Sequence, residues 1–233
     1  MSRHTELALG VVVDSDGNKL LTGSRFEGAE FDEFSIGPVE NPGLSYRIEN
    51  TEFLRCNINP GEFAIRAGVR LQNVLFDSVS SRDSMLVSSS AVFDRVKIKG
   101  RMSTGGLWVK PDEVFDEARD GKLRKWAENA ISEIDWMIDI SDYWGPEVTV
   151  LGWPADKIIV DSSRHVLVRS DWNRAVDWDN LGIGPTGFFR VSVRYLRGFG
   201  VETGVFSLPD EGNSEYDKTF AEMALLREAG FIS

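Results

Sequence analysis

The stretch Thr51-Glu52-Phe53-Leu54-Arg55-Cys56-Asn57-Ile58 holds the pattern that decides the fold. A small residue stands two places before a large apolar one, and this pair recurs after five residues. Three further segments, 29–31, 69–76 and 91–98, share the pattern. The four segments begin roughly twenty residues apart, which is a repeat length typical of stacked β-coils. Each coil of such a stack buries its large side chains only against its neighbours.

The five-residue pattern of small, polar, large, polar and any residue fits segments 51–55, 56–60, 61–65, 91–95 and 96–100. It resembles the pattern of the pentapeptide-repeat family, over residues 26–103 only. The resemblance implies a right-handed, four-sided β-helix in which the large residue and the small one two places earlier point inward. A looser right-handed parallel β-helix fits the same residues, and an antiparallel meander is the alternative.

We therefore predict a mainly β protein, in which a short right-handed parallel β-helix of about four coils precedes an α+β C-terminal portion. The predicted domains are an N-terminal hairpin at 1–22, a β-helix scaffold at 23–110, and an acidic, Trp-rich portion at 111–233 that caps the solenoid. An apolar stripe at helical spacing predicts a helix at 122–137, which would cover the open end of the coils. The other predicted elements are hairpin strands at 7–13 and 19–22, strands at 147–151, 157–160, 165–169 and 188–196, and a helix at 216–229.

The composition is that of an ordinary globular chain, with 42% apolar and 27% charged residues among 233. The sequence has no apolar run long enough to predict a membrane-spanning helix. The apolar start at 7–13 is interrupted by Gly10, so no signal peptide is expected. Cys56 is the single cysteine and occupies a small-residue position of the repeat, which predicts a buried thiol and a cytoplasmic protein.

The net charge of −11 is unevenly distributed. Residues 1–110 carry 13 basic and 14 acidic side chains, whereas residues 111–233 carry 13 basic and 23 acidic ones. All seven tryptophans lie between positions 108 and 178. These patterns predict a nearly neutral scaffold joined to an acidic, Trp-rich portion. They disfavour nucleic-acid binding, because phosphates require a basic surface.

Catalysis finds little support in the sequence. His165 lies near Asp161 and Ser163, but residues so close on one extended segment do not converge into a triad. One cysteine and two histidines supply no zinc ligand set, so we predict neither a metal nor a cofactor. The enzyme alternative is a carbohydrate-active protein that uses paired carboxylates, from Asp135, Asp139 and Asp142 or from Asp171, Asp177 and Asp179.

Protein binding is the favoured function. Residues 128–161 contain eight acids and one base, with Trp136, Tyr143, Trp144 and Trp153 between them. The segment 139–147 is predicted to be a loop, where aromatic side chains are harder to bury. Aromatic anchors surrounded by carboxylates suit a basic partner. The predicted partner-binding residues are Asp135, Asp139, Asp142, Tyr143, Trp144 and Glu147.

The predicted partner is a basic protein. Binding to nucleic acid or to a membrane is not expected. Nuclease toxins carry basic, phosphate-seeking sites, and their cognate immunity proteins are commonly acidic. By this physical analogy, we predict an immunity protein that neutralises a basic, nuclease-type toxin. The other alternative is a DNA mimic that modulates a topoisomerase. Mimicry requires negative charge along the coils, which are nearly neutral.

Overall fold

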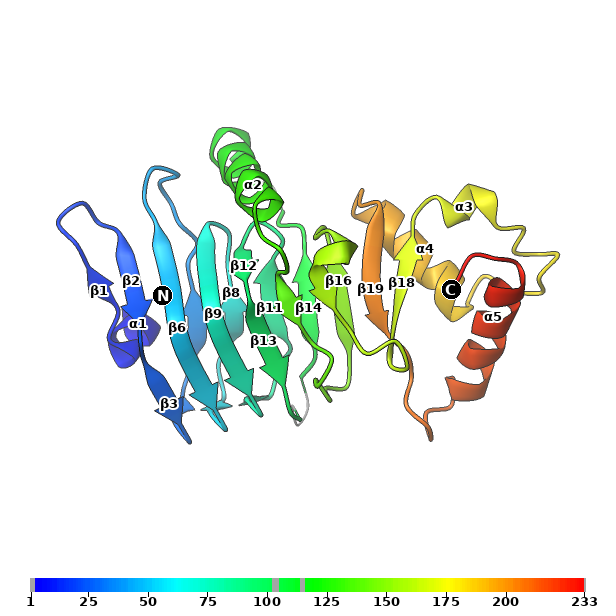
Figure 1. The fold of residues 1–233 in the computed structure, drawn as a ribbon, viewed down its shortest axis with the longest axis horizontal. Helices are drawn as coiled ribbons and strands as arrows, with labels where there is room; N and C mark the ends of the chain where they lie inside the picture. The colour runs from blue at the N-terminus through cyan, green and yellow to red at the C-terminus, as the bar shows by residue number, and fades with distance from the viewer. Residues whose placement is uncertain (1–2, 102–104, 114–115, 233) are drawn as a thin grey trace.

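The computed structural model describes residues 3–101, 105–113 and 116–232. In these residues the strands form three sheets, most of whose strands pair in parallel (Figure 1). The chain visits the sheets in turn: β6 (Tyr46–Leu54) lies in the first, β7 (Asn57–Ile58) in the second and β8 (Phe63–Ile65) in the third. β9 (Val69–Asp77) then returns to pair with β6, and Tyr46 lies opposite Val69. One such pass is called a circuit below.

The remaining strands extend these three sheets. The first sheet also contains β1 (Val12–Val13), β2 (Lys19–Thr22), β3 (Arg25–Glu27), β12 (Val92–Asp94), β13 (Val96–Lys99), β15 (Ile138–Asp139) and β17 (Ile158–Ile159). The second contains β4 (Glu30–Phe31) and β10 (Ser80–Ser81). The third contains β5 (Phe34–Ile36), β11 (Met85–Ser88), β14 (Leu107–Lys110), β16 (Val148–Leu151), β18 (His165–Arg169) and β19 (Thr203–Ser207).

The helices lie outside the stacked strands. They are α1 (Arg3–Leu9), α2 (Glu117–Ser132), α3 (Trp172–Ala175), α4 (Phe188–Gly198) and α5 (Tyr216–Glu228), with a short 3₁₀ turn η1 (Ala155–Lys157). No helix in the described ranges is both long enough and apolar enough to cross a membrane.

Large apolar side chains from successive circuits stack on one another in the core between the sheets. Phe26 pairs with Phe53, Phe53 with Phe76, and Phe76 with Ile98. The Phe53 ring lies nearly parallel to the rings of Phe26 and Phe76, with centroids 5.2 and 5.0 Å away. Thr51, two places before Phe53, is also fully buried. The predicted inward orientation of the small and large positions is therefore confirmed here.

Two corners of each circuit use left-handed backbone. Asn50, Asn73 and Arg95 have positive φ at one corner, 23 and 22 positions apart. Arg55 and Ser78 have positive φ at the next corner, also 23 positions apart. Asparagine tolerates this conformation better than most residues. The side chain of Asn73 also donates a hydrogen bond to Asn50 Oδ1 (3.1 Å), which links one circuit to the next.

Helix α2 does not close an end of the stack, so that prediction is wrong. The helix begins at the cap Asp116, whose carboxylate accepts hydrogen bonds from the amides of Ala118 and Arg119. It lies along one side of the stack (Figure 1), and its Leu123 packs close to Gly68. The strand pairing continues beyond it, from β13 to β15 and from β14 to β16. The sheets therefore run across the boundary predicted at residue 110.

The N-terminal end of the stack is covered by α1, where the sequence predicted a strand. Thr5 Oγ1 donates to the carbonyl of Glu33 (3.1 Å), and the amide of Ser35 in β5 donates to Thr5 Oγ1 (3.4 Å). Only the short β1 remains of the first predicted hairpin strand. It pairs antiparallel with β2 as expected, with Val12 opposite Leu20.

The C-terminal residues build a second apolar core. It joins Leu151 at the end of β16 to residues of β18, β19, α3, α4 and α5. The predicted strand at 188–196 is wrong, because this segment is helix α4. Its buried Phe189, Val193 and Leu196 follow helical spacing, whereas the alternation of Phe189, Val191, Val193 and Tyr195 with polar residues also fits a strand. The strands predicted at 147–151, 157–160 and 165–169 and the helix at 216–229 are present with small shifts of their ends.

Replacing Phe53 with alanine should lower the free energy of unfolding by about 3–5 kcal/mol. The substitution empties the middle of the Phe26–Phe53–Phe76 stack. Urea denaturation measures the change. The control is Phe199→Ala at an exposed ring, which should cost about 1 kcal/mol or less. Equal losses for the two variants would contradict a core built from the stacked rings.

Candidate functional site

The structure places Asp139 and Asp142 around one lysine of the neighbouring circuit. Asp139 of β15 lies beside Lys97 of β13 in the first sheet. Lys97 Nζ lies 3.2 Å from a carboxylate oxygen of Asp139 and 2.8 Å from one of Asp142. Hydrogen bonding to the carboxylate of Asp142 is the main cause that raises the pKa of Lys97. Both predicted interface acids are thus ion-paired within the chain.

The carboxylate of Asp139 also organises the loop that follows it. Its Oδ1 accepts hydrogen bonds from the amide (3.0 Å) and the hydroxyl (2.6 Å) of Ser141. Burial by itself would raise the pKa of Asp139, but the hydrogen bonds from Ser141 and Lys97 outweigh it and hold the pKa below its usual value. We therefore assign Asp139 a structural role in shaping this loop.

Tyr143 is buried, so the prediction that it contributes an exposed aromatic ring is wrong. Its side chain is 1% exposed and packs against Gly145, where a β-carbon would collide with the tyrosine ring. The loop is fixed on both sides of Tyr143. The amide of Tyr143 donates to the Ile140 carbonyl (3.1 Å), and the amide of Trp144 donates to the Gly100 carbonyl (2.9 Å). This pinned backbone directs Tyr143 inward and Trp144 outward.

Trp144 is the most exposed tryptophan that the structure describes. Its side chain is 58% exposed, whereas the other six are buried or half-buried. The guanidinium of Arg164 lies 4.0 Å from the centroid of the Trp144 ring, and it also donates a hydrogen bond to the Tyr143 carbonyl. This cation–π contact holds the exposed indole in one place.

A groove lies beside Trp144 and joins it to distant parts of the chain. Arg164, Tyr216 and Phe220 line the groove, together with the exposed acids Asp210 and Glu211. We call Trp144, Arg164, Tyr216, Phe220, Asp210 and Glu211 the Trp144 surface. Sequence reasoning missed the members at 164 and beyond, because their approach to Trp144 depends on how the second core packs.

The two other predicted acids lie on either side of this loop. Asp135 precedes β15 and Glu147 precedes β16, and both side chains are exposed. Neither forms an ion pair with any residue that the structure describes. Glu147 lies on the rim of a different cleft, which also contains Trp108. The six predicted residues therefore do not form one continuous patch.

His165 has a structural role. It is buried at the start of β18, and its Nδ1 lies 3.2 Å from the Asp161 carbonyl. The hydroxyl of Ser163 donates to the carboxylate of Asp161 (2.7 Å), so the three side chains do not form a relay. Across the described ranges, no group of three or more acidic, histidine or cysteine side chains is placed to hold a metal ion.

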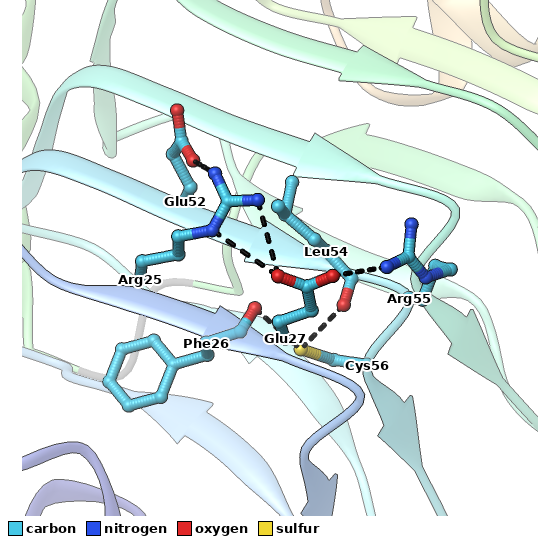
Figure 2. Close-up of polar contacts among 7 residues, drawn as sticks. All are labelled: Arg25, Phe26, Glu27, Glu52, Leu54, Arg55 and Cys56. Carbon is cyan, nitrogen blue, oxygen red and sulfur yellow. Dashed lines mark hydrogen bonds and ion pairs between the residues drawn. The ribbon is translucent and has the colours of Figure 1, made fainter.

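Charged residues on the early circuits pair with one another. Glu27 bridges Arg25 and Arg55, and Arg25 also contacts Glu52 of the next circuit (Figure 2). Such exposed pairs contribute little to stability, but they cancel charge locally. Beneath them the thiol of Cys56 donates to the Phe26 carbonyl (3.5 Å), and burial raises its pKa (Figure 2). The predicted burial of Cys56 is confirmed.

Comparisons with protein-family models, with curated proteins and with solved structures found no match to this chain. Its function is therefore inferred from the geometry and the charge of its own residues.

The burial of His165 should make the stability depend on pH. Burial lowers the pKa of His165 below its ordinary value of 6.5, so near that pH the unfolded chain binds a proton that the folded chain does not. The free energy of unfolding should therefore fall as the pH drops from 7.5 through 6.5 to the folded-state pKa. Urea denaturation across this range measures the slope.

Two variants assign that slope to one residue. His165→Gln should flatten the dependence between pH 7.5 and the folded-state pKa, whatever its effect on absolute stability. Phe199→Ala, which removes no titratable group, should leave the dependence unchanged. A slope that persists in His165→Gln would contradict this origin.

Proposed function

We propose that this chain is a protein-binding inhibitor that docks a basic partner on the Trp144 surface. The exposed indole of Trp144 carries this proposal. An aromatic ring that is more than half exposed, yet held by Arg164 and by a backbone pinned to Gly100, is already oriented for contact. Binding then requires little further ordering of the anchor, which favours affinity.

The shape and composition of the Trp144 surface support this role. Tyr216 and Phe220 pack together on α5, with ring centroids 4.3 Å apart, and they border the same groove as Trp144. Aromatic residues and arginine are the types enriched in binding hot spots. A partner side chain that enters the groove would contact all three aromatic rings.

The charge of the chain favours a basic partner. The net charge is −11, and Asp210 and Glu211 border the groove without an ion pair in the described residues. Asp135 and Glu147 add exposed carboxylates near the same loop. Such a field accelerates the encounter with a positively charged protein. A nuclease-type toxin in the cytoplasm is the partner class that we propose, with this chain as its immunity protein.

The proposed scaffold for this surface is a right-handed parallel β-helix. The three parallel sheets, visited in turn by successive circuits, support this form. Crossover connections between parallel strands of one sheet are almost always right-handed.

The enzyme alternative has less support. It needs two carboxylates close together in a concave site. Glu147 and Glu215 border the cleft at Trp108, but both are exposed. The buried carboxylate of Glu222 faces the start of α4, where the amide of Phe189 donates to it at 3.5 Å. That contact explains the burial of the Glu222 carboxylate without a catalytic role.

Trp144→Ala should weaken binding of the basic partner at least ten-fold, because the partner loses its aromatic anchor. The partner is first captured from a lysate of the source organism with the wild-type chain, then purified and titrated calorimetrically. Phe199→Ala is the matched control, since it also removes an exposed aromatic ring but lies outside the Trp144 surface. It should bind like the wild type.

The charge dependence is a separate measurement. Asp210→Lys should slow association and reduce the loss of affinity with added salt, because it removes part of the steering field. It is a better choice than a change at Asp139 or Asp142, whose carboxylates hold Lys97. Equal affinity for Trp144→Ala and wild type, or a captured partner that is acidic, would refute the proposal.

A further inference from the structure

A second cleft lies on the outer face of the third sheet and is distinct from the Trp144 surface. Trp108 of β14, Thr149 of β16 and Phe206 of β19 lie side by side in register on this face. Helix α4 contacts β18 and β19, and Val191 and Tyr195 of the helix border the cleft. Trp108 and Thr149 of the sheet therefore form one wall of the cleft, and helix α4 forms another.

Two residues that line this cleft each carry a buried polar atom without a hydrogen-bond partner among the described residues. These groups are the indole N–H of Trp108 and the hydroxyl of Thr219 on α5. Thr219 is only 1% exposed. An unsatisfied buried donor is costly, and native structures rarely keep one without a reason. Both groups can donate to the same kind of partner, an acceptor oxygen.

The remaining walls define what that partner looks like. Phe188, Val191 and Phe206 offer apolar contact. The charged side chains that line the cleft in the described ranges are Glu147 and Glu215, and Lys218, which is not a lining residue, pairs with Glu215 at 3.2 Å. Two carboxylates disfavour an anion. The cleft volume of about 440 Å³ lies within the range of small-molecule sites.

We propose that this cleft binds a small, uncharged molecule with an apolar body and a carbonyl-type oxygen. The oxygen accepts hydrogen bonds from Trp108 Nε1 and Thr219 Oγ1, and the apolar body lies against Phe188 and Phe206. This inference is independent of the protein-binding proposal, because it uses none of the residues of the Trp144 surface.

The test uses three probes of similar shape and follows the indole N–H signal of Trp108 by ¹H–¹⁵N NMR. Trp108→Phe assigns the signal. Benzamide carries the neutral carbonyl oxygen, benzoate is its anionic counterpart, and toluene lacks an acceptor. Benzamide should shift the Trp108 signal in a saturable manner and bind at least five-fold more tightly than benzoate or toluene. An unshifted Trp108 signal, or equal affinity for the three probes, would overturn the proposal.

The hydroxyl of Thr219 is tested by removing it with little change in shape. Thr219→Val should weaken benzamide about five-fold and leave toluene unchanged, because one hydrogen bond is lost. Thr51→Val is the matched control: Thr51 is equally buried, but its hydroxyl donates to the Glu49 carbonyl (2.8 Å) in the first sheet. It should not change benzamide binding.

The same two variants separate binding from folding. Without ligand, Thr219→Val should be as stable as the wild type or more stable, because an unsatisfied hydroxyl is removed. Thr51→Val should be less stable, because it loses a hydrogen bond that is made. Unchanged benzamide affinity in Thr219→Val, or a loss of stability equal to that of Thr51→Val, would show that the hydroxyl is not available for a ligand.

Discussion

The structure depends on keeping apolar side chains of parallel strands in register from one circuit to the next. Phe26, Phe53 and Phe76 form one such column, and Ile36, Ile65 and Val87 form another in the third sheet. A slip of one residue would turn each column toward solvent. The left-handed corners stand at equivalent positions of successive circuits: Asn50 and Asn73 bend β6 and β9 at the same place, and Arg55 and Ser78 turn the chain from the first sheet into the second.

This constraint acts on the strands and leaves the connections free. Val96 pairs with Ile138 although α2 lies between them, whereas Tyr46 pairs with Val69 only 23 positions away. An insertion therefore changes what lies beside the stack and not its alignment. The loop from Ser141 to Glu147 is another such connection. It displays Trp144 while β15 and β16 on either side of it stay paired.

The inward positions at Thr51, Phe53, Cys56 and Ile58 follow from sequence because burial alternates locally along a strand. The outward direction of Trp144 and the burial of Tyr143 do not follow, because backbone bonds to Gly100 and Ile140 decide them. Helix α4 was missed since its apolar residues fit two periods, and packing against the second core selects one. For the same reason Arg164 beside Trp144, and Thr219 at the second cleft, are visible only in three dimensions.

The outermost strands have a consequence for self-association. Parallel strands in register are the geometry that amyloid-like fibres extend, one molecule upon another. Here β1 runs antiparallel to β2 at one edge of the first sheet, and β18 runs antiparallel to β19 at one edge of the third. A second molecule that arrives at β1 meets a reversed, two-residue strand rather than a template for its own first circuit, whereas β18 runs in the same direction as β16 because β19 is antiparallel to both. The reversal at β1 opposes the addition of another molecule at that edge of the first sheet.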